Sequence, residues 1–288
     1  MSTVRLEPVQ RSLAGRTWSG VRRDPLLVLA ACVCALMALV VLVGPLLAPY
    51  PPDQTDILAA NQGASSAHWL GTDALGRDTT SRLLYGARPS LVAAGLVVVC
   101  STALGTLLAI VAVWYGGWVD RTLMRVSNVL FAIPSILLAM VGVAIIGAGI
   151  VAPVIALSIV YSPYIARVGR SVALPERRKP YIEACQLAGF SKTRIWFFHL
   201  LPNMRGILVA QSTVALGFAL MDLAAISFIG LGVQPPSADW GVMVSEGRSA
   251  LLNGQPMQAL TAGTVIVVCV VAAMVLGERL TARAKGAL

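Results

Sequence analysis

The sequence has little charge. Asp, Glu, Lys and Arg make up only 12% of its 288 residues, whereas hydrophobic residues make up 57%, and the mean hydropathy is +0.78. A soluble globular domain carries about 25% charged residues. The scarcity of charge, together with uncharged runs too long for a soluble core, excludes an ordinary soluble domain and predicts a membrane protein.

The sequence also lacks the side-chain groupings on which catalytic and metal sites depend. His68 and His199 are its only histidines, and the topology derived below places them on opposite sides of the membrane. No Ser-His-Asp group, carboxylate pair or cluster with metal-ligand spacing occurs on one side. A GxxxxGK[ST] phosphate loop is also missing, because Lys192-Thr193 follows Ser191 where the motif requires glycine. We therefore expect no catalytic residue, no metal site and no cofactor bound by this chain.

The five cysteines show no pattern typical of a disulfide framework. None falls in a segment that we assign to the outer side of the membrane, where disulfides persist. Four lie inside apolar runs and one lies in a basic loop: Cys32, Cys34, Cys100, Cys269 and, in the loop, Cys185. We interpret them as small apolar side chains that pack in the protein interior.

Long apolar runs dominate what is present. They occupy residues 26–48, 91–115, 126–166, 206–230 and 257–277. The third run would reach ~60 Å as one helix at ~1.5 Å per residue, twice the thickness of a ~30 Å bilayer core. Gly147-Ala148-Gly149 with Pro153 is the natural point for a hairpin within it. The sequence therefore predicts an all-α membrane protein with six transmembrane helices.

The basic residues are distributed unevenly between the two sides. With the N-terminus inside, the outer segments hold few of the 22 Lys and Arg, namely Arg77, Arg82, Arg88 and Arg248. This asymmetry follows the positive-inside rule and predicts that both termini are cytoplasmic. It also accounts for the net charge of +9, so we expect membrane lipid and no nucleic acid as a partner.

We divide the chain accordingly. The first span follows an Arg-rich segment and is too long for a signal peptide, so we expect an uncleaved helix. The six predicted spans are 26–48, 91–115, 123–146, 150–168, 206–230 and 257–277. On the cytoplasmic side we expect an N-terminal segment at 1–25, a loop at 169–205 and a tail at 278–288. On the outer side we expect a loop with a short helix at 49–90 and a second loop at 231–256.

The cytoplasmic loop contains signals for two short helices. Pro180 is suited to the first turn of a helix and Gly189 to its C-terminal cap. Ser191 can then cap a second helix, which we expect to end before Pro202. The result is a helix–glycine–helix elbow whose apolar and charged side chains could fit a groove on a soluble partner.

Three stretches carry a resemblance to a known family. The elbow resembles the "EAA" loop of bacterial ABC importer permeases, although Cys185 replaces the usual Ala and His199 the usual Ile. Its ending, His-Leu-Leu-Pro-Asn, resembles the dipeptide/oligopeptide/nickel branch. The outer segments 68–91 and 227–243 resemble that branch too, so the resemblance covers most of the chain. Residues that the resemblance assigns to coupling with an ATPase are Glu183, Ala184, Cys185, Gly189, Arg194, His199 and Pro202.

The resemblance implies a type I importer permease core in the bacterial inner membrane, crossing it several times. It implies a heterodimer with a homologous sister permease, two cytoplasmic ATPase subunits or a fused pair, and an extracytoplasmic substrate-binding protein. ATP and Mg would be held by the ATPase subunits. The most probable cargo it implies is a dipeptide or oligopeptide, and the elbow would couple ATP hydrolysis to transport.

Two groups of residues have both a local and a functional interpretation. In the outer loop, the local interpretation is that Asp73 caps a short helix and that Asp78 pairs with Arg82. The functional interpretation is contact with a binding protein. Candidates for that contact are Trp69, Asp73, Arg77, Asp239 and Trp240. In the fifth span, Asp222 is the only buried acid, and it either lines a transport cavity, together with Ser227, or makes a structural hydrogen bond.

Other classes of transporter stay open at this point. A nickel or metal-chelate permease of the same branch is the nearest alternative, because a chelated metal needs no protein ligand. A secondary transporter or channel would need no ATPase, and its energy source would distinguish it. A membrane scaffold without transport is disfavoured by the three matched stretches.

Overall fold

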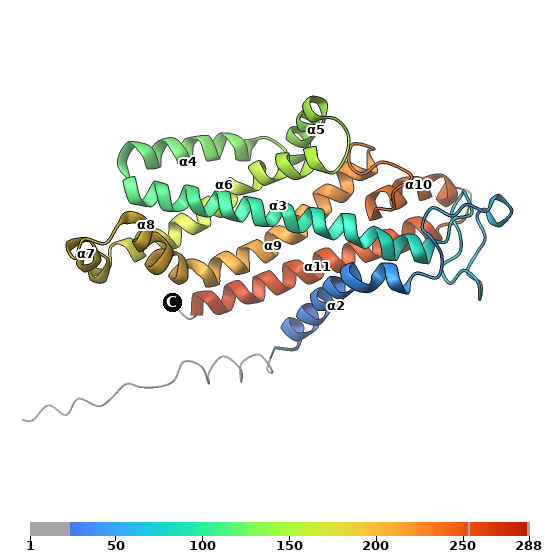
Figure 1. The fold of residues 1–288 in the computed structure, drawn as a ribbon, viewed down its shortest axis with the longest axis horizontal. Coiled ribbons are helices and arrows are strands. Elements are labelled where there is room, and N and C mark those ends of the chain that lie inside the picture. Colours follow the sequence, from blue (N-terminus) through green and yellow to red (C-terminus); the bar gives the residue numbers. More distant parts are fainter. Residues whose placement is uncertain (1–23, 253, 287–288) are drawn as a thin grey trace, which may run out of the picture.

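The computed structural model describes residues 24–252 and 254–286, and almost all of them are helical or in connecting loops (Figure 1). Residues 1–23 of the predicted cytoplasmic segment, with Arg5, Arg11 and Arg16, lie outside the described residues. The elements in chain order are α2 (Pro25–Leu47), the 3-10 turn η1 (Ile57–Ala59), α3 (Thr79–Tyr115), α4 (Gly117–Ala132), α5 (Ser135–Ile146), α6 (Val151–Arg177), α7 (Pro180–Leu187), α8 (Lys192–Ile195), the π turn η2 (Trp196–Leu200), α9 (Leu201–Phe228), α10 (Trp240–Leu252) and α11 (Met257–Gly286).

Five helices are long and apolar enough to cross a bilayer, and a bent pair makes up to six spans. The five are α2, α3, α6, the continuous stretch Lys192–Phe228, and α11. The bent pair is α4 with α5. The all-α membrane architecture expected from the sequence is thereby confirmed, including the hairpin at 147–149, where Gly147 and Gly149 take positive φ angles between α5 and α6.

The third predicted span, 123–146, is not one straight helix. It consists of α4 and α5, which meet at an angle of 90°. Pro134 explains the break, because it has no N–H for a helical hydrogen bond and pushes the preceding residue away from helical geometry. Ile133 accordingly has an extended backbone, with φ −88° and ψ 126°.

Several helices continue beyond the predicted spans. α3 begins at Thr79, not 91, because the Asp78 side chain caps it by accepting a hydrogen bond from the Ser81 N–H at 2.7 Å. α6 runs on to Arg177 and α11 to Gly286, through parts of the predicted loop and tail, and α10 lies in the predicted second outer loop. The apolar pattern ends where charge begins, whereas a helix ends only where caps, Gly or Pro stop it.

The long helices approach one another closely through small residues. α3 packs along α6, and α9 along α11. A Cβ added at Gly105 would lie 2.5 Å from the Ser162 carbonyl oxygen, and one at Gly277 would lie 2.6 Å from the Val214 nitrogen. Small residues at helix contacts are typical of membrane bundles, where backbone packing replaces the hydrophobic driving force.

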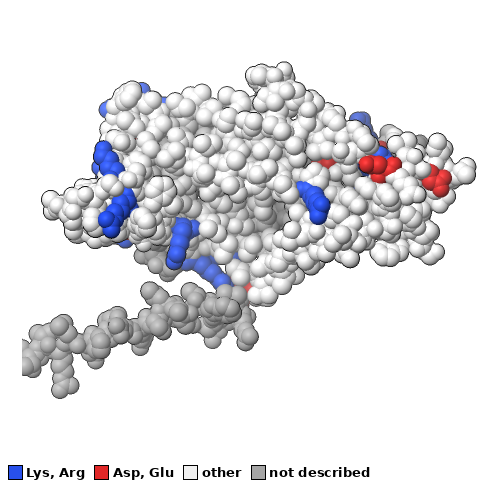
Figure 2. Space-filling view, in the orientation of Figure 1, with Lys and Arg blue, Asp and Glu red and all other residues white. Residues whose placement is uncertain are grey.

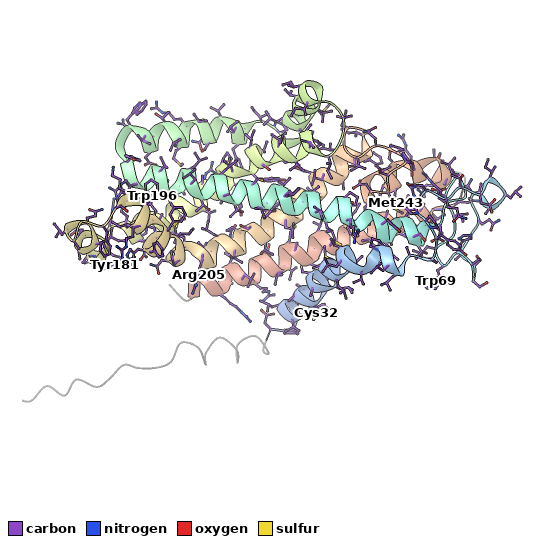
Figure 3. The ribbon with its side chains drawn as sticks, viewed as in Figure 1. Cys32, Trp69, Tyr181, Trp196, Arg205 and Met243 are labelled. Atoms are coloured by element: carbon purple, nitrogen blue, oxygen red, sulfur yellow. The ribbon has the colours of Figure 1, made fainter. Side chains whose placement is uncertain are left out.

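Two ends of the bundle differ in character. The loop end consists of residues 48–78, 231–252 and 254–256, and it carries Trp69 in Figure 3. The opposite end carries the elbow (residues 180–200), with Tyr181 and Trp196. Figure 2 shows that most of the acidic side chains visible on this face lie at the loop end, whereas most of the basic side chains lie toward the elbow end. Both ends hold candidate functional residues.

Candidate functional site

The elbow folds as its local sequence predicts. Pro180 occupies the first turn of α7, and Gly189 follows the helix with φ +78°, which a residue without Cβ adopts readily. The N–H of Phe190 donates to the Cys185 carbonyl at 3.0 Å and closes the turn. The Ser191 hydroxyl accepts from the Arg194 N–H at 3.3 Å and caps α8. The helix–glycine–helix geometry is therefore confirmed.

The second helix does not end before Pro202, contrary to prediction. It passes from α8 through the π turn η2 directly into α9, and Pro202 lies in the first turn of α9. A π turn widens the helix by one residue, so a proline without an N–H can follow it without losing a required hydrogen bond. The elbow is consequently continuous with a membrane-spanning helix.

Buried side chains anchor the elbow to the bundle. Ile182 of α7, Ile195 of α8 and Leu200 of η2 have no exposed surface. They belong to one apolar cluster with Val113 of α3, Ile165 of α6 and with Met204 and Leu208 of α9. This tight packing holds the elbow against three long helices, α3, α6 and α9.

The outer face of the elbow is apolar and open. Leu187 is 91% exposed, Phe198 71% and Phe197 63%. Glu183 and Ala184 are also exposed, and Glu183 has no ion-pair partner among the described side chains. Glu183 therefore forms no salt bridge within its own loop. Leu187 lies one turn after Glu183 on α7, and a large exposed apolar side chain of this kind is typical of a surface for another protein.

The remaining elbow candidates shape its inner face. The Cys185 thiol lies 3.7 Å from Nε2 of His199, whose ring stacks on Phe190 at 6.3 Å. Arg194 also contacts Phe190, because its guanidinium carbon lies over the ring at 4.2 Å from the ring centre. Cys185, Arg194 and His199 are thereby brought together, and they hold the two short helices at a fixed angle.

A tyrosine ties the elbow to the end of α6. The Tyr181 hydroxyl donates to Glu176 at 2.6 Å and accepts from the Asn203 amide at 3.1 Å. Burial, together with the Glu176 hydrogen bond and charge, raises the pKa of Tyr181 to about 12. Its hydroxyl therefore stays protonated and keeps donating at physiological pH. No sequence pattern singled out this pair.

At the loop end, a cluster of buried charges replaces the expected local contacts. Arg77 donates to Asp73 at 2.6 Å and to Glu246 of α10 at 2.9 Å. Arg82, which has no exposed surface, donates to Glu246 at 2.8 Å, while Asp78 contacts His68 at 2.9 Å. The predicted Asp78–Arg82 pair does not form, and Asp73 accepts hydrogen bonds in a tight turn and does not cap a helix. The cluster ties the first loop to α10.

Asp239 and Trp240 form a second buried joint. The Ser90 hydroxyl of α3 donates to Asp239 at 2.6 Å, and the Trp240 indole donates to the Leu83 carbonyl at 2.9 Å. Burial raises the pKa of Asp239, while hydrogen bonds from Ser90, Ser227 and the backbone oppose the rise. Ser227 is also buried at this joint. It is not among the residues that line the cavity described below, and its cavity role stays a prediction.

Burial of the side chains also decides whether the candidates at the loop end hold the local structure together or contact a binding protein. Contact with a partner protein requires an exposed side chain. Trp69 is 66% exposed and remains a candidate. The other four are 2–4% exposed, so we correct their assignment from partner contact to internal joints of the loop end: Asp73, Arg77, Asp239 and Trp240.

A cavity of about 520 Å³ lies where α4 and α5 meet, against α6 and α9. Tyr161 of α6 lines it and donates a hydrogen bond to Asp222 of α9 at 2.8 Å. Asp222 thus makes the structural hydrogen bond, to a residue that lines the cavity, whereas it is not itself among the lining residues and its transport role stays a prediction. The remaining lining residues are mostly apolar: Phe131, Ala132, Ile133, Pro134, Ser135, Val160, Tyr164, Ala215 and Phe218.

Comparison with known sequences gives consistent matches. Residues 101–286 match the family described as binding-protein-dependent transport system inner membrane component, and residues 12–64 match the N-terminal TM domain of oligopeptide transport permease C. The glutathione transport system permease protein GsiD of Pectobacterium atrosepticum is 37% identical, with 95% of this chain and 92% of the relative covered. The dipeptide transport system permease protein DppC of Alkalihalophilus pseudofirmus is 34% identical, over 90% and 85%.

Among solved structures, the inward-facing MetNI methionine ABC transporter contains a similar chain. The TM-score is 0.54 at 21% identity, with 70% of this chain and 95% of the other covered. At that identity the likeness concerns the fold alone, and it confirms the expected type I importer permease core.

Proposed function

The chain belongs to the family of binding-protein-dependent transport system inner membrane components, and from this premise we propose that it forms half of the pathway of an ATP-driven importer for short peptides. It is a multi-pass inner-membrane permease subunit of an ABC importer, as its family and relatives establish. The substrate proposal is supported by two relatives, which are named as permeases of a glutathione and of a dipeptide transport system.

The observation that carries the proposal is the exposed elbow, rigidly anchored to three long helices. Its exposed apolar side chains, Leu187, Phe197 and Phe198, and the exposed Glu183 one turn before Leu187, suit a groove on a soluble ATPase subunit. The buried side chains beneath it connect that face to α3, α6 and α9. An ATPase that moves the elbow would therefore move the helices around the cavity.

We further propose the assembly in which this happens. The chain pairs with a homologous sister permease, its elbow docks on one of two cytoplasmic ATPase subunits or a fused pair, and a binding protein docks at the loop end near Trp69. Both termini and the elbow lie in the cytoplasm, which the basic side chains at the elbow end support. ATP and Mg bind to the ATPase subunits. Closure of these subunits pushes the elbow and switches the cavity between inward- and outward-facing states.

Replacing Glu183 by Arg tests the coupling role. Reversal of this charge places a cation where the ATPase groove is complementary to an acid, so we expect peptide uptake to fall to background while membrane insertion is unchanged. The measurement is uptake of labelled dialanine by cells, with immunoblots of the membrane fraction. Ser249→Arg, which introduces an Arg side chain at an exposed position of the loop end, is the control and should transport normally.

Either of two results would contradict the proposal. Wild-type uptake by the Glu183→Arg variant would remove the coupling role of the elbow. Gene-dependent uptake of labelled nickel, without uptake of peptide, would replace the substrate class by a metal chelate.

A further inference from the structure

A groove of about 800 Å³ lies between α3 and α9 and shares no lining residue with the cavity at Tyr161. On α3 its lining extends from Val98 to Ile110, which is twelve residues or ~18 Å along the helix axis. One leaflet of a bilayer provides ~15 Å of hydrocarbon, half of a ~30 Å core. Because both helices are long and apolar enough to cross a membrane, the groove has the length and the setting of one lipid acyl chain.

The groove is apolar at one end and charged toward the other. Val98 and Leu216 line it far from the elbow. In the middle, the hydroxyls of Thr102 and Ser212 bond to each other at 2.7 Å, so neither needs a further partner. Arg205 lines the groove toward the elbow, and Figure 3 shows Arg205 on the elbow side of the bundle. The groove therefore has the polarity of an amphiphile.

Three lining residues on the elbow side carry polar groups without a partner among the residues that the structure describes. Arg205 is exposed and forms no ion pair or hydrogen bond there. Thr106 is only 8% exposed, and its hydroxyl has no hydrogen-bond partner. The same holds for the indole N–H of Trp196. Buried donors are almost always paired, so two unpaired ones near a free cation indicate a ligand with oxygen acceptors and a negative charge.

Packing against α6 places two of these groups at a similar depth. A Cβ added at Gly169 would lie 3.0 Å from Cβ of Ala109 and 3.3 Å from Cε of Met204. Thr106 precedes Ala109 by three residues on α3, and Arg205 directly follows Met204 on α9. Thr106 and Arg205 therefore lie within about one helical turn of each other along the bundle, so one headgroup can contact both.

We propose that the groove binds one anionic phospholipid of the leaflet on the elbow side. The phosphate accepts hydrogen bonds from Arg205, an ester carbonyl accepts from Thr106, and an acyl chain lies along the apolar part toward Val98. Basic side chains between transmembrane helices are typical sites for anionic headgroups. The inference goes beyond the proposed function and does not depend on the substrate.

Other occupants would leave part of the groove unsatisfied. A soluble anion could pair with Arg205 but would leave the apolar length uncovered, whereas each buried CH₂ of an acyl chain adds to binding. An apolar helix of a second subunit would cover that length but leave Arg205 without an opposite charge. A lipid with an anionic head meets both requirements.

The test measures lipid binding to the complete importer, purified in detergent and depleted of lipid, by native mass spectrometry. Wild type should bind phosphatidylglycerol about tenfold more tightly than phosphatidylcholine with the same acyl chains. Arg205→Gln should bind the two lipids equally, and Arg205→Lys should retain most of the preference. Arg125→Gln is the control, because Arg125 is exposed on α4 and does not line the groove. Copurification of the partner subunits verifies assembly of each variant.

Two further variants separate the headgroup from the acyl chain. Thr106→Val keeps the shape of the side chain and removes its hydroxyl, so phosphatidylglycerol should bind about threefold more weakly. Ala103→Phe adds a ring at an exposed position that lines the groove, so it should displace the acyl chain and weaken binding at least as much.

Several results would overturn the inference. Equal binding of the two lipids by wild type, or the same preference in Arg205→Gln as in Arg125→Gln, would show that the groove does not select an anionic head. Unchanged binding in Ala103→Phe would exclude an acyl chain in the groove, and competition by inorganic phosphate would then identify a soluble anion. Crosslinking of Ala103→Cys to the sister permease would assign the groove to that subunit. Peptide uptake enters none of these measurements, so each result leaves the proposed function unchanged.

Discussion

At the scale of single residues, Glu246 is the residue on which the loop end depends most. It is the common partner of Arg77 and Arg82, which are 4% and 0% exposed in their side chains. Glu246→Ala would leave two buried cations to share Asp73, and removal of one partner from a buried ion pair costs ~3–5 kcal/mol. We expect a clearly lower melting temperature of the purified protein in detergent, followed by intrinsic fluorescence.

Arg248→Ala is the matched control for this change. Arg248 lies on the same helix, two residues further on, and its side chain is exposed. Its removal should leave the melting temperature unchanged, since isolated surface charges contribute little. Equal melting of the two variants would show that the buried cluster does not stabilise the loop end.

At the scale of elements, the contact between α3 and α6 depends on Gly105. A Cβ at this position would meet the Ser162 carbonyl oxygen at 2.5 Å and Cβ of Ile165 at 2.6 Å. Gly105→Ala should therefore push the helices apart and destabilise the protein by ~1–3 kcal/mol. Gly95→Ala on the same helix meets nothing within 4 Å and should be neutral or slightly stabilising. Thermal unfolding in detergent compares the two, and equal stability would contradict the close packing.

The elements that could be predicted from the sequence are those with local causes. The elbow follows from Pro180, Gly189 and Ser191, whose effects act within one turn of a helix. The bend at Pro134 had a local signal as well, but the apolar run continues through it, and hydropathy alone does not distinguish a straight helix from a broken one. The apolar pattern also does not mark where a helix continues beyond the membrane.

Contacts between distant residues could not be predicted in this way. The hydrogen bond from Arg82 to Glu246 joins residues 164 positions apart, and nothing near Arg82 in the sequence indicates it. The nearby Asp78 offered a plausible local partner, but it caps α3 and contacts His68. Asp222 could be recognised from the sequence as an exceptional acid. Its partner Tyr161 and the cavity between α6 and α9 could not be recognised, because they also depend on contacts between distant residues.

At the scale of the whole molecule, the proposed mechanism requires the elbow and the loop end to lie on opposite sides of the membrane. The bundle places Tyr181 and Trp69 at its two ends, and the membrane-length helices between them keep the ends apart (Figure 3). Basic residues concentrate at the elbow end, so the positive-inside rule orients that end toward the cytoplasm. This orientation is a prediction, and it can be measured without any transport assay.

Single cysteines introduced at exposed positions report the side directly. In a variant without the five native cysteines, Phe198→Cys should react with a membrane-impermeant maleimide only in inverted vesicles, because the elbow faces the cytoplasm. Trp69→Cys should react in intact spheroplasts, because the loop end faces outward. Both native side chains are well exposed, so access of the reagent depends on the side alone. Labelling of Phe198→Cys in intact spheroplasts would reverse the orientation, and an elbow outside the cell could not couple to a cytoplasmic ATPase.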